Sequence, residues 1–231
     1  MRFSRPGEGA ASTACRIYLV RHGTTRMNLE NRYRGRREVP LDNQGWADAR
    51  AAGERLLGAE LTAVYAGPLR RTLDTAYVIA KRNGGVPVYP LPGLVNLDYG
   101  AWEGLTSQEA TERDPRAFRL YREAPELAVC PGGESLLDAS DRILIALEAI
   151  ARQHQGQSVA AVTHAAMVRL AVARITGRLG PDWRIALPTG SITVVESSEG
   201  ELSVPLRANA STWVLDLRGL EGRQAAGTHS G

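Results

Sequence analysis

Two histidines that follow apolar runs are the residues of this chain best suited to chemistry. His22 comes after Arg16–Val20 and stands directly beside Arg21, and His164 comes after Ser158–Thr163. A ring nitrogen of histidine can attack phosphorus and form a covalent intermediate, and arginine offers a planar set of donors that fits phosphate or carboxylate. These residue types together indicate an anion-binding site that contains a nucleophile.

Other polar side chains follow apolar runs in the same way. Arg70 and Arg71 come shortly after residues 61–66, and Asn96 follows an extended piece near Leu94. If the runs are parallel strands, their carboxyl ends meet at one edge of the sheet, where ligands bind in open α/β folds. Two histidines and at least two arginines would then surround one pocket that suits a dianion. Phosphoryl transfer requires such positive donors, together with a nucleophile in line with the leaving group.

Alternating helical and extended patterns must position these groups. The short connections between them predict a largely parallel sheet covered on both faces, which is a three-layer α/β/α sandwich. We expect a single domain over residues 16–217, a flexible lead-in over 1–15 and a flexible tail over 218–231. The expected strands span 16–20, 61–66, 86–89, 158–163, 191–196, 201–204 and 213–217, and the expected helices span 45–57, 68–83, 106–123 with a break at Asp114-Pro115, 134–154 and 165–175.

The composition of the 231 residues narrows the class of protein. A hydrophobic fraction of 43% with 23% charged residues is ordinary for a globular protein, and a net charge of +3 without a basic block gives nucleic-acid binding little support. Lys81 is the only lysine, so the chain has no Walker A phosphate loop. No apolar run is long enough to span a bilayer. We therefore expect a cytoplasmic protein without a membrane partner, in which Cys15 and Cys130 are free thiols.

Several segments, in the same order, resemble those of the histidine phosphatase superfamily, the group that includes cofactor-dependent phosphoglycerate mutase. Together they cover roughly residues 16–217. The resemblance implies a phosphoglycerate mutase-like α/β/α fold. Residues 21–28 are similar to the R-H-G-x-T-x-x-N signature, 68–76 to P-L-x-R-A-x-x-T-A, 94–104 to L-x-E-x-D-[FY]-G-x-W-E-G, 131–135 to P-G-G-E-S and 162–169 to V-[ST]-H-G-G-x-x-R.

The resemblance also implies roles for single residues. It makes His22 the phosphorylated nucleophile, Arg21, Asn28 and Arg71 phosphate ligands, and His164 the second histidine of the pocket. The implied activity is a phosphatase that acts on a small phosphorylated metabolite through a phosphohistidine, without a metal or a cofactor. Mutase activity is less expected, because the E-R-H-Y-G segment and the additional loops of phosphoglycerate mutases are missing.

One position departs from the family pattern. Where the family has the glutamate that protonates the leaving oxygen, this chain has Asn96, which we expect to contact the substrate. An amide donates a hydrogen bond but no proton, and loss of a positioned acid costs about 10²–10⁴-fold in rate. Three explanations stay open. In the first, the proton comes from Glu103 or from Asp98, which would face the same side of an extended strand as Asn96. In the second, the substrate has a leaving group that needs no proton. In the third, the chain is a slow enzyme, a phospho-ligand binding protein or a catalyst of another reaction.

Residues outside this set receive structural roles. We expect Arg70 to be an exposed helix charge and His154 to be solvated. Trp102 and Trp183 are expected to serve in packing.

Two loops and an arginine cluster are expected to cover the pocket. The arginines of segment 32–37 follow the phosphate loop directly and are expected to attract an anionic substrate to the pocket mouth. Loops 105–133 and 176–190 are expected to set the identity of the substrate, for which the sequence carries no readable code. A homodimer is left open.

Overall fold

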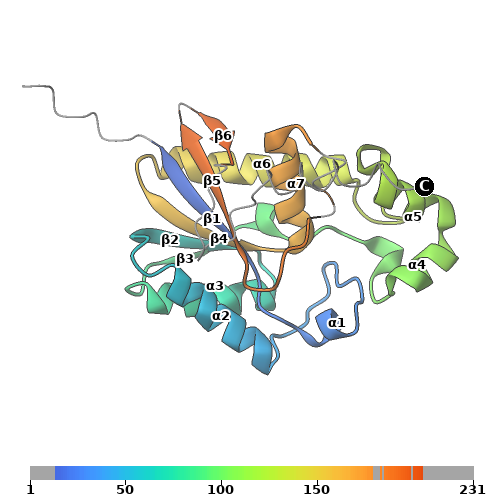
Figure 1. The fold of residues 1–231 in the computed structure, drawn as a ribbon, viewed down its shortest axis with the longest axis horizontal. Helices are drawn as coiled ribbons and strands as arrows, with labels where there is room; N and C mark the ends of the chain where they lie inside the picture. The colour runs from blue at the N-terminus through green and yellow to red at the C-terminus, as the bar shows by residue number, and fades with distance from the viewer. Residues whose placement is uncertain (1–13, 179–182, 184, 199, 205–231) are drawn as a thin grey trace, which may run out of the picture.

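A six-stranded sheet lies between two layers of helices in the computed structural model, which describes residues 14–178, 183, 185–198 and 200–204 (Figure 1). The strands are β1 (Cys15–Arg21), β2 (Leu61–Ala66), β3 (Val88–Pro90), β4 (Ser158–Thr163), β5 (Ile192–Ser198) and β6 (Glu201–Ser203). Their order is β3-β2-β4-β1-β5-β6. The pairings among β3, β2, β4 and β1 are parallel, and those of β5 with β1 and with β6 are antiparallel. The expected α/β/α sandwich with a mostly parallel sheet is confirmed.

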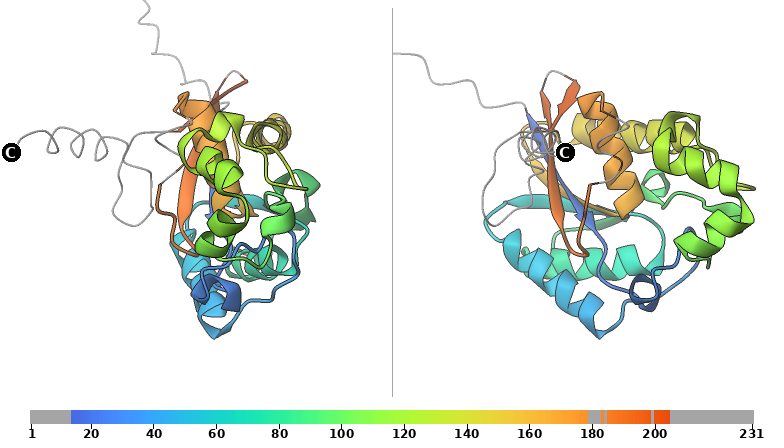
Figure 2. Two further views of the ribbon diagram at one scale, coloured as in Figure 1. Left: turned by 90° about the vertical axis from the view of Figure 1, so that its right-hand side faces the viewer. Right: turned by 45° about the vertical axis from the view of Figure 1, so that its right-hand side comes forward.

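Seven α-helices and three 3₁₀ turns make up the helical part of the described residues. They are α1 (Arg26–Leu29), α2 (Asn43–Arg55), α3 (Arg70–Arg82), η1 (Pro92–Leu94), η2 (Gly100–Trp102), α4 (Ser107–Arg113), α5 (Pro115–Glu123), η3 (Pro125–Leu127), α6 (Leu136–Gln153) and α7 (Ala165–Thr176). Helices α2 and α3 cover one face of the sheet, and α6 and α7 cover the other (Figure 1). Helices α4 and α5, drawn in green, stand at one end of the molecule (Figure 2). They are separated at Asp114-Pro115 as expected, because the residue before a proline avoids the helical conformation.

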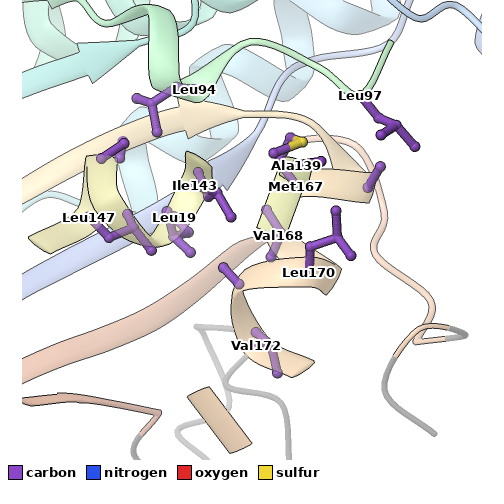
Figure 3. Packing of buried hydrophobic residues seen from close by; sticks show 14 of the residues in the cluster. Leu19, Leu94, Leu97, Ala139, Ile143, Leu147, Met167, Val168, Leu170 and Val172 are labelled. Atoms are coloured by element: carbon purple, nitrogen blue, oxygen red, sulfur yellow. The ribbon is translucent and has the colours of Figure 1, made fainter. Parts of the chain in front are cut away.

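Alternate side chains of each central strand enter two separate cores. On β4, Val159 and Ala161 belong to the core beneath α6 and α7, whereas Ala160 and Val162 belong to the core beneath α2 and α3. Figure 3 shows the first of these cores, where apolar side chains of α6 pack against Leu19 of β1. A strand buried on both faces has no polar side, which is why these strands are continuous apolar runs in the sequence.

The chain between β3 and α4 is not the extended piece expected from the sequence. Leu94 lies in a 3₁₀ turn, and residues 95–99 belong to no strand. Helix α6 holds this segment, because Nη1 of Arg142 donates to the carbonyl oxygens of Gly93 and Val95 at 2.9 Å each. A hydrogen bond from a distant helix thus decides the local conformation.

Some expectations concern parts of the chain that are not described. The strand over 213–217, the tail over 218–231 and the lead-in as far as residue 13 lie outside the described residues. Cys15, expected in the lead-in, is the first residue of β1. Cys15 and Cys130 are buried free thiols, as expected. Within the described ranges, no helix combines the length and the apolar character needed to cross a membrane.

Two glycines hold the loop after β1 against helix α2. A Cβ atom on Gly23 would lie 2.2 Å from the carbonyl oxygen of Gly45, and a Cβ atom on Gly45 would lie 2.0 Å from the carbonyl oxygen of Thr24. Asp42 caps the helix, because its Oδ1 accepts a hydrogen bond from the N–H of Gly45 at 2.7 Å. The first turn of α2 therefore packs backbone to backbone on the loop, which only glycine permits.

We expect Gly45→Ala to lower the free energy of unfolding by about 2 kcal/mol, because the added methyl group meets a backbone carbonyl. Gly53→Ala in the same helix is the matched control. Its Cβ atom would meet Cδ of Arg82 at 2.8 Å, which is part of a flexible side chain, and alanine favours the helix by about 1 kcal/mol. Urea unfolding measures both variants. An unchanged or higher midpoint for Gly45→Ala contradicts this account of the packing.

Candidate active site

His22 stands where β1 ends, in a loop bonded to two neighbouring elements. Its N–H donates to the carbonyl oxygen of Thr163 on β4 at 3.0 Å, and the N–H of Gly23 donates to Oγ1 of Thr75 on α3 at 3.2 Å. Nδ1 of the His22 ring lies 2.6 Å from the carbonyl oxygen of Gly23. Because a carbonyl only accepts, Nδ1 carries the proton, and Nε2 carries the lone pair that can attack an electrophile.

His164 lies against His22 from the end of β4. The centroids of the two rings are 5.0 Å apart, and the two residues are 1% and 2% exposed. Burial lowers the pKa of both imidazoles well below its usual value, and the charges of Arg71, Arg34 and Arg21 lower it further. Both rings are therefore neutral at neutral pH, which keeps Nε2 of His22 nucleophilic.

Three guanidinium groups surround the histidines. Arg21 donates to the carbonyl oxygen of Leu187, and Arg71 donates to the carbonyl oxygens of Gly35 at 2.8 Å and Arg37 at 2.7 Å. Burial lowers the pKa of Arg21 and of Arg71 to about 10, so both remain protonated at neutral pH. The third group belongs to Arg34, whose side chain has no hydrogen-bond or ion-pair partner among the described residues.

Every buried side-chain polar atom without a partner, within the described part of the chain, belongs to this cluster. These atoms are both ring nitrogens of His164 and the Nε atoms of Arg21, Arg34 and Arg71. Buried polar groups are nearly always satisfied, because one left unpaired costs about 1–3 kcal/mol. The cluster matches a phosphoryl group, whose oxygens accept hydrogen bonds from several donors at once.

The two asparagines predicted to bind substrate both line the pocket beside this cluster. Oδ1 of Asn28 accepts hydrogen bonds from the N–H and the hydroxyl of Thr25 at 3.0 and 2.8 Å. Its amide group is thereby oriented with the oxygen toward its own loop. Asn96 is 4% exposed, and its Nδ2 donates to the carbonyl oxygen of Gly35 at 3.0 Å. The same carbonyl accepts from Arg71, so Asn96 is tied to the guanidinium cluster.

Neither carboxylate considered as a replacement acid lines the pocket. Oδ2 of Asp98 lies 3.3 Å from Nη1 of Arg36. Glu103 accepts a hydrogen bond from the N–H of Arg36 at 2.7 Å and lies 3.7 Å from Nε of Arg37. Asp98 shares no strand with Asn96, so the expectation of a common strand face is wrong. Both carboxylates hold the loop that contains these arginines.

The pocket has a volume of about 760 Å³, and both arginines and aromatic rings line it. Tyr33, Tyr99, Tyr121 and Trp183 line it, and their ring centroids lie 4.7–6.0 Å from one another in successive contacts. No Asp or Glu occurs among the described residues of the lining. The pocket therefore favours an anion and offers apolar surface to the remainder of a ligand.

Both loops expected to cover the pocket contribute to it. Ser107, Tyr121 and Arg122 come from the segment 105–133, and Trp183 and Thr189 come from the described residues of 176–190. Arg32 and Arg34 of the arginine cluster also line the pocket. His22 and Arg71, which are 1% and 0% exposed, are not among the residues that line the pocket.

Sequence analysis missed a residue of α6 that positions this site. Arg142 pairs with Glu134 at 2.8 Å and donates to the carbonyl oxygen of Asn96 at 3.4 Å. The P-G-G-E-S segment thus supports the loop that carries Asn96. The separation of eight residues between Glu134 and Arg142 did not predict their ion pair, because Glu134 precedes the helix and is not a helical neighbour of Arg142.

The structural roles expected for other residues are confirmed with one exception. The side chain of Arg70 is 72% exposed, and Trp102 is fully buried. Trp183 is buried as well, although it also lines the pocket. His154 was expected to be solvated, and this is wrong: it is 8% exposed, and its Nε2 lies 2.9 Å from the hydroxyl of Tyr65. Its partner comes from β2, which the polar sequence around His154 did not indicate.

We expect the free energy of unfolding to fall as the pH drops below about 6.5, the ordinary pKa of histidine. The folded protein keeps His22 and His164 neutral, whereas the unfolded chain takes up their protons, so acid favours unfolding. Each histidine contributes up to about 1.4 kcal/mol per pH unit in this range. Urea unfolding at several pH values measures the slope. A His22→Gln, His164→Gln double variant should give a smaller slope, and an equal slope contradicts the burial of neutral imidazoles.

Inorganic phosphate and orthovanadate are expected to raise the temperature of unfolding, because their oxygens accept from the unpaired groups of the cluster. Ligand at 100 times its Kd stabilises by about 2.7 kcal/mol. Arg71→Gln and His164→Gln should each remove most of the shift measured in a thermal unfolding assay. Arg70→Gln is the matched control, because the neighbouring arginine is exposed and lies outside the cluster. A shift that survives both Arg71→Gln and His164→Gln places the anion elsewhere.

Comparison with known proteins identifies the family. The chain is 36% identical over 204 residues to the bifunctional protein Rv2228c of Mycobacterium tuberculosis. The aligned region covers 86% of this chain but only 55% of that protein. It is 38% identical over 167 residues to the metal-independent phosphoserine phosphatase of Arabidopsis thaliana, covering 71% of this chain and 70% of that protein. The structure of Bacillus stearothermophilus YhfR matches with a TM-score of 0.77 at 33% identity, over 86% of this chain and 97% of that chain. The model of the histidine phosphatase superfamily, branch 1, matches residues 17–210, and the chain belongs to this superfamily.

Proposed function

We propose that the protein is a phosphatase that hydrolyses a small phosphorylated metabolite through a phosphohistidine on Nε2 of His22. The observation that carries the proposal is the gathering of all unpaired buried polar atoms of the described chain around one neutral imidazole. The name of the Arabidopsis relative supports the reaction class. Catalytic roles for His22, His164, Arg21 and Arg71, and substrate contacts for Asn28 and Asn96, are part of the proposal.

In the first step, His22 displaces the leaving group from phosphorus. Arg21, Arg71 and His164 hold the phosphoryl oxygens while the lone pair of Nε2 attacks. The P–N bond forms, the bond from phosphorus to the leaving oxygen breaks, and that oxygen keeps the electron pair. The hydrogen bond from Nδ1 to the carbonyl oxygen of Gly23 fixes the ring and stabilises the positive charge that the ring gains.

In the second step, water attacks the phosphorus of the phosphohistidine. A P–O bond forms, the P–N bond breaks, and its electron pair returns to Nε2 of His22. Both protons of the water leave with the product as H₂PO₄⁻, and the ring is neutral again. The guanidinium groups offset the negative charge of the phosphoryl oxygens in both transition states, which in phosphoryl transfer are loose and need mainly charge stabilisation and positioning.

We expect 4-nitrophenyl phosphate to be hydrolysed by the wild type, and His22→Ala to lower kcat/KM by about 10⁴-fold or more, because the nucleophile is lost. Radiolabelled substrate followed by rapid denaturation should leave an acid-labile, base-stable label on the wild type and none on the variant. His154→Gln is the control, because it changes another buried histidine that lies outside the pocket. Full activity in His22→Ala rules out the proposed intermediate.

The alternative function, a phospho-ligand binding protein, is motivated by Asn96 at the position of the family's acid. The same experiments separate the two. Stabilisation by phosphate without phosphate release or a labelled histidine supports the binding protein. A cytoplasmic location and a homodimer stay predictions.

A further inference from the structure

The leaving oxygen is the reacting atom for which the site offers no evident acid. When its bond to phosphorus breaks, an enzyme meets the charge on this oxygen with a proton from a positioned acid or with a fixed cation. In-line displacement puts the oxygen on the side of phosphorus away from His22. His164 offers no proton to this oxygen, because burial keeps its ring neutral, and the ring packs 5.0 Å from that of His22. The groups that meet the leaving oxygen come from other walls of the pocket.

No carboxylic acid of the described residues is placed to protonate this oxygen. Asn96 stands where the resemblance places the acid of the family, and the described residues of the lining include no Asp or Glu. The hydroxyls of Tyr99 and Tyr121 lie 3.1 Å apart, and burial raises the pKa of both phenols. A buried phenol is a poor proton donor, because its anion is disfavoured away from water.

Arg34 places a permanent positive charge in the same pocket, and it differs from the other arginines of segment 32–37. It lines the pocket, and its guanidinium group pairs with no carboxylate among the described residues. Its charge reaches the reacting centre, since it lowers the pKa of His22 and of His164. The other three arginines of segment 32–37 each have an acidic partner: Arg32 has Glu109 at 2.8 Å, Arg36 has Asp98 at 3.3 Å and Arg37 has Glu103 at 3.7 Å.

Asn96 binds the backbone next to Arg34 and brings no charge that would pair with the guanidinium group. Nδ2 of Asn96 donates to the carbonyl oxygen of Gly35, the next residue in the chain after Arg34, and both side chains line the pocket. A glutamate in place of Asn96 would bring a carboxylate to this wall, and the carboxylate and the guanidinium would attract each other. That pairing would hold the carboxylate ionised and neutralise the cation. The neutral amide does neither.

On the basis of the proposed phosphatase function, we propose that Arg34 binds the leaving group and takes up its charge in place of proton transfer. The substrates are then acyl phosphates or phosphoanhydrides. Nε2 of His22 forms the P–N bond, the P–O bond breaks, and the leaving oxygen departs with its electron pair as a carboxylate or a phosphate anion, without a proton. Carboxylates, with a pKa of about 4, and phosphomonoesters, with a second pKa of about 6, leave in this way at neutral pH, whereas the alkoxide of a serine does not.

Acetyl phosphate and phosphoserine test the substrate class. We expect kcat/KM of the wild type to be higher for acetyl phosphate by at least about 10²-fold, the lower range of what a positioned acid contributes. Asn96→Glu should lower the value for acetyl phosphate and narrow the difference, because the new carboxylate pairs with Arg34. Phosphate release in matched buffers measures all four combinations.

A series from 4-nitrophenyl to phenyl phosphate tests Arg34 itself, because the basicity of the leaving phenolate increases along it. Arg34→Gln should steepen the fall in kcat/KM, with a loss of about 10²-fold on phenyl phosphate and a smaller loss on 4-nitrophenyl phosphate. Arg34→Lys should restore part of the loss. Arg70→Gln is the matched control, because this arginine is 72% exposed, pairs with Asp74 and keeps its side chain outside the pocket.

The possible failures are distinguishable. Comparable turnover of phosphoserine and acetyl phosphate by the wild type, or a uniform loss along the aryl series in Arg34→Gln, overturns the role of Arg34 while the phosphohistidine stands. Absence of phosphate release from every substrate, with no label on His22, overturns the proposed function as well.

Discussion

The burial of several guanidinium groups around a pocket whose described lining includes no carboxylate is the constraint on which the rest of this structure depends. Charged groups removed from water are costly unless other polar groups replace the water. Here backbone carbonyl oxygens do so, because Arg71 donates to Gly35 and Arg37 and Arg21 donates to Leu187. Burial, together with the same charges, lowers the pKa of both imidazoles and keeps them neutral. A field that disfavours cationic histidines favours a dianion in the same place.

The carbonyl groups can serve this purpose only if their loops are held in position, and the acidic residues of the region provide the hold. Asp98 and Glu103 bind arginines of the loop that contains Gly35, and Glu134 binds Arg142, which in turn binds the carbonyl oxygens around Asn96. Carboxylates are thus present close to the site, but Asp98, Glu103 and Glu134 do not line the pocket. This placement orders the backbone and leaves the pocket positive.

The central elements could be predicted because their physical causes are local. Strands β1, β2 and β4 lie between two layers of helices and therefore consist of continuous apolar runs. The break before Pro115 follows from backbone geometry. The segment before Asn96 and the burial of His154 could not be predicted in this way. Arg142 of α6 shapes the first, and Tyr65 of β2 provides the partner for the second.

The sequence by itself determined which residues stand at the ends of the parallel strands, and therefore that His22 and His164 meet at one edge of the sheet. It also determined that Asn96 lacks an ionisable proton. Only the tertiary structure decided which charges share the pocket. Of the arginines in segment 32–37, Arg34 alone has a guanidinium group without an acidic partner among the described residues. The physical reason is that distant elements of the fold supply the partners that orient a side chain in a loop. The spacing of residues along the sequence does not predict those partners.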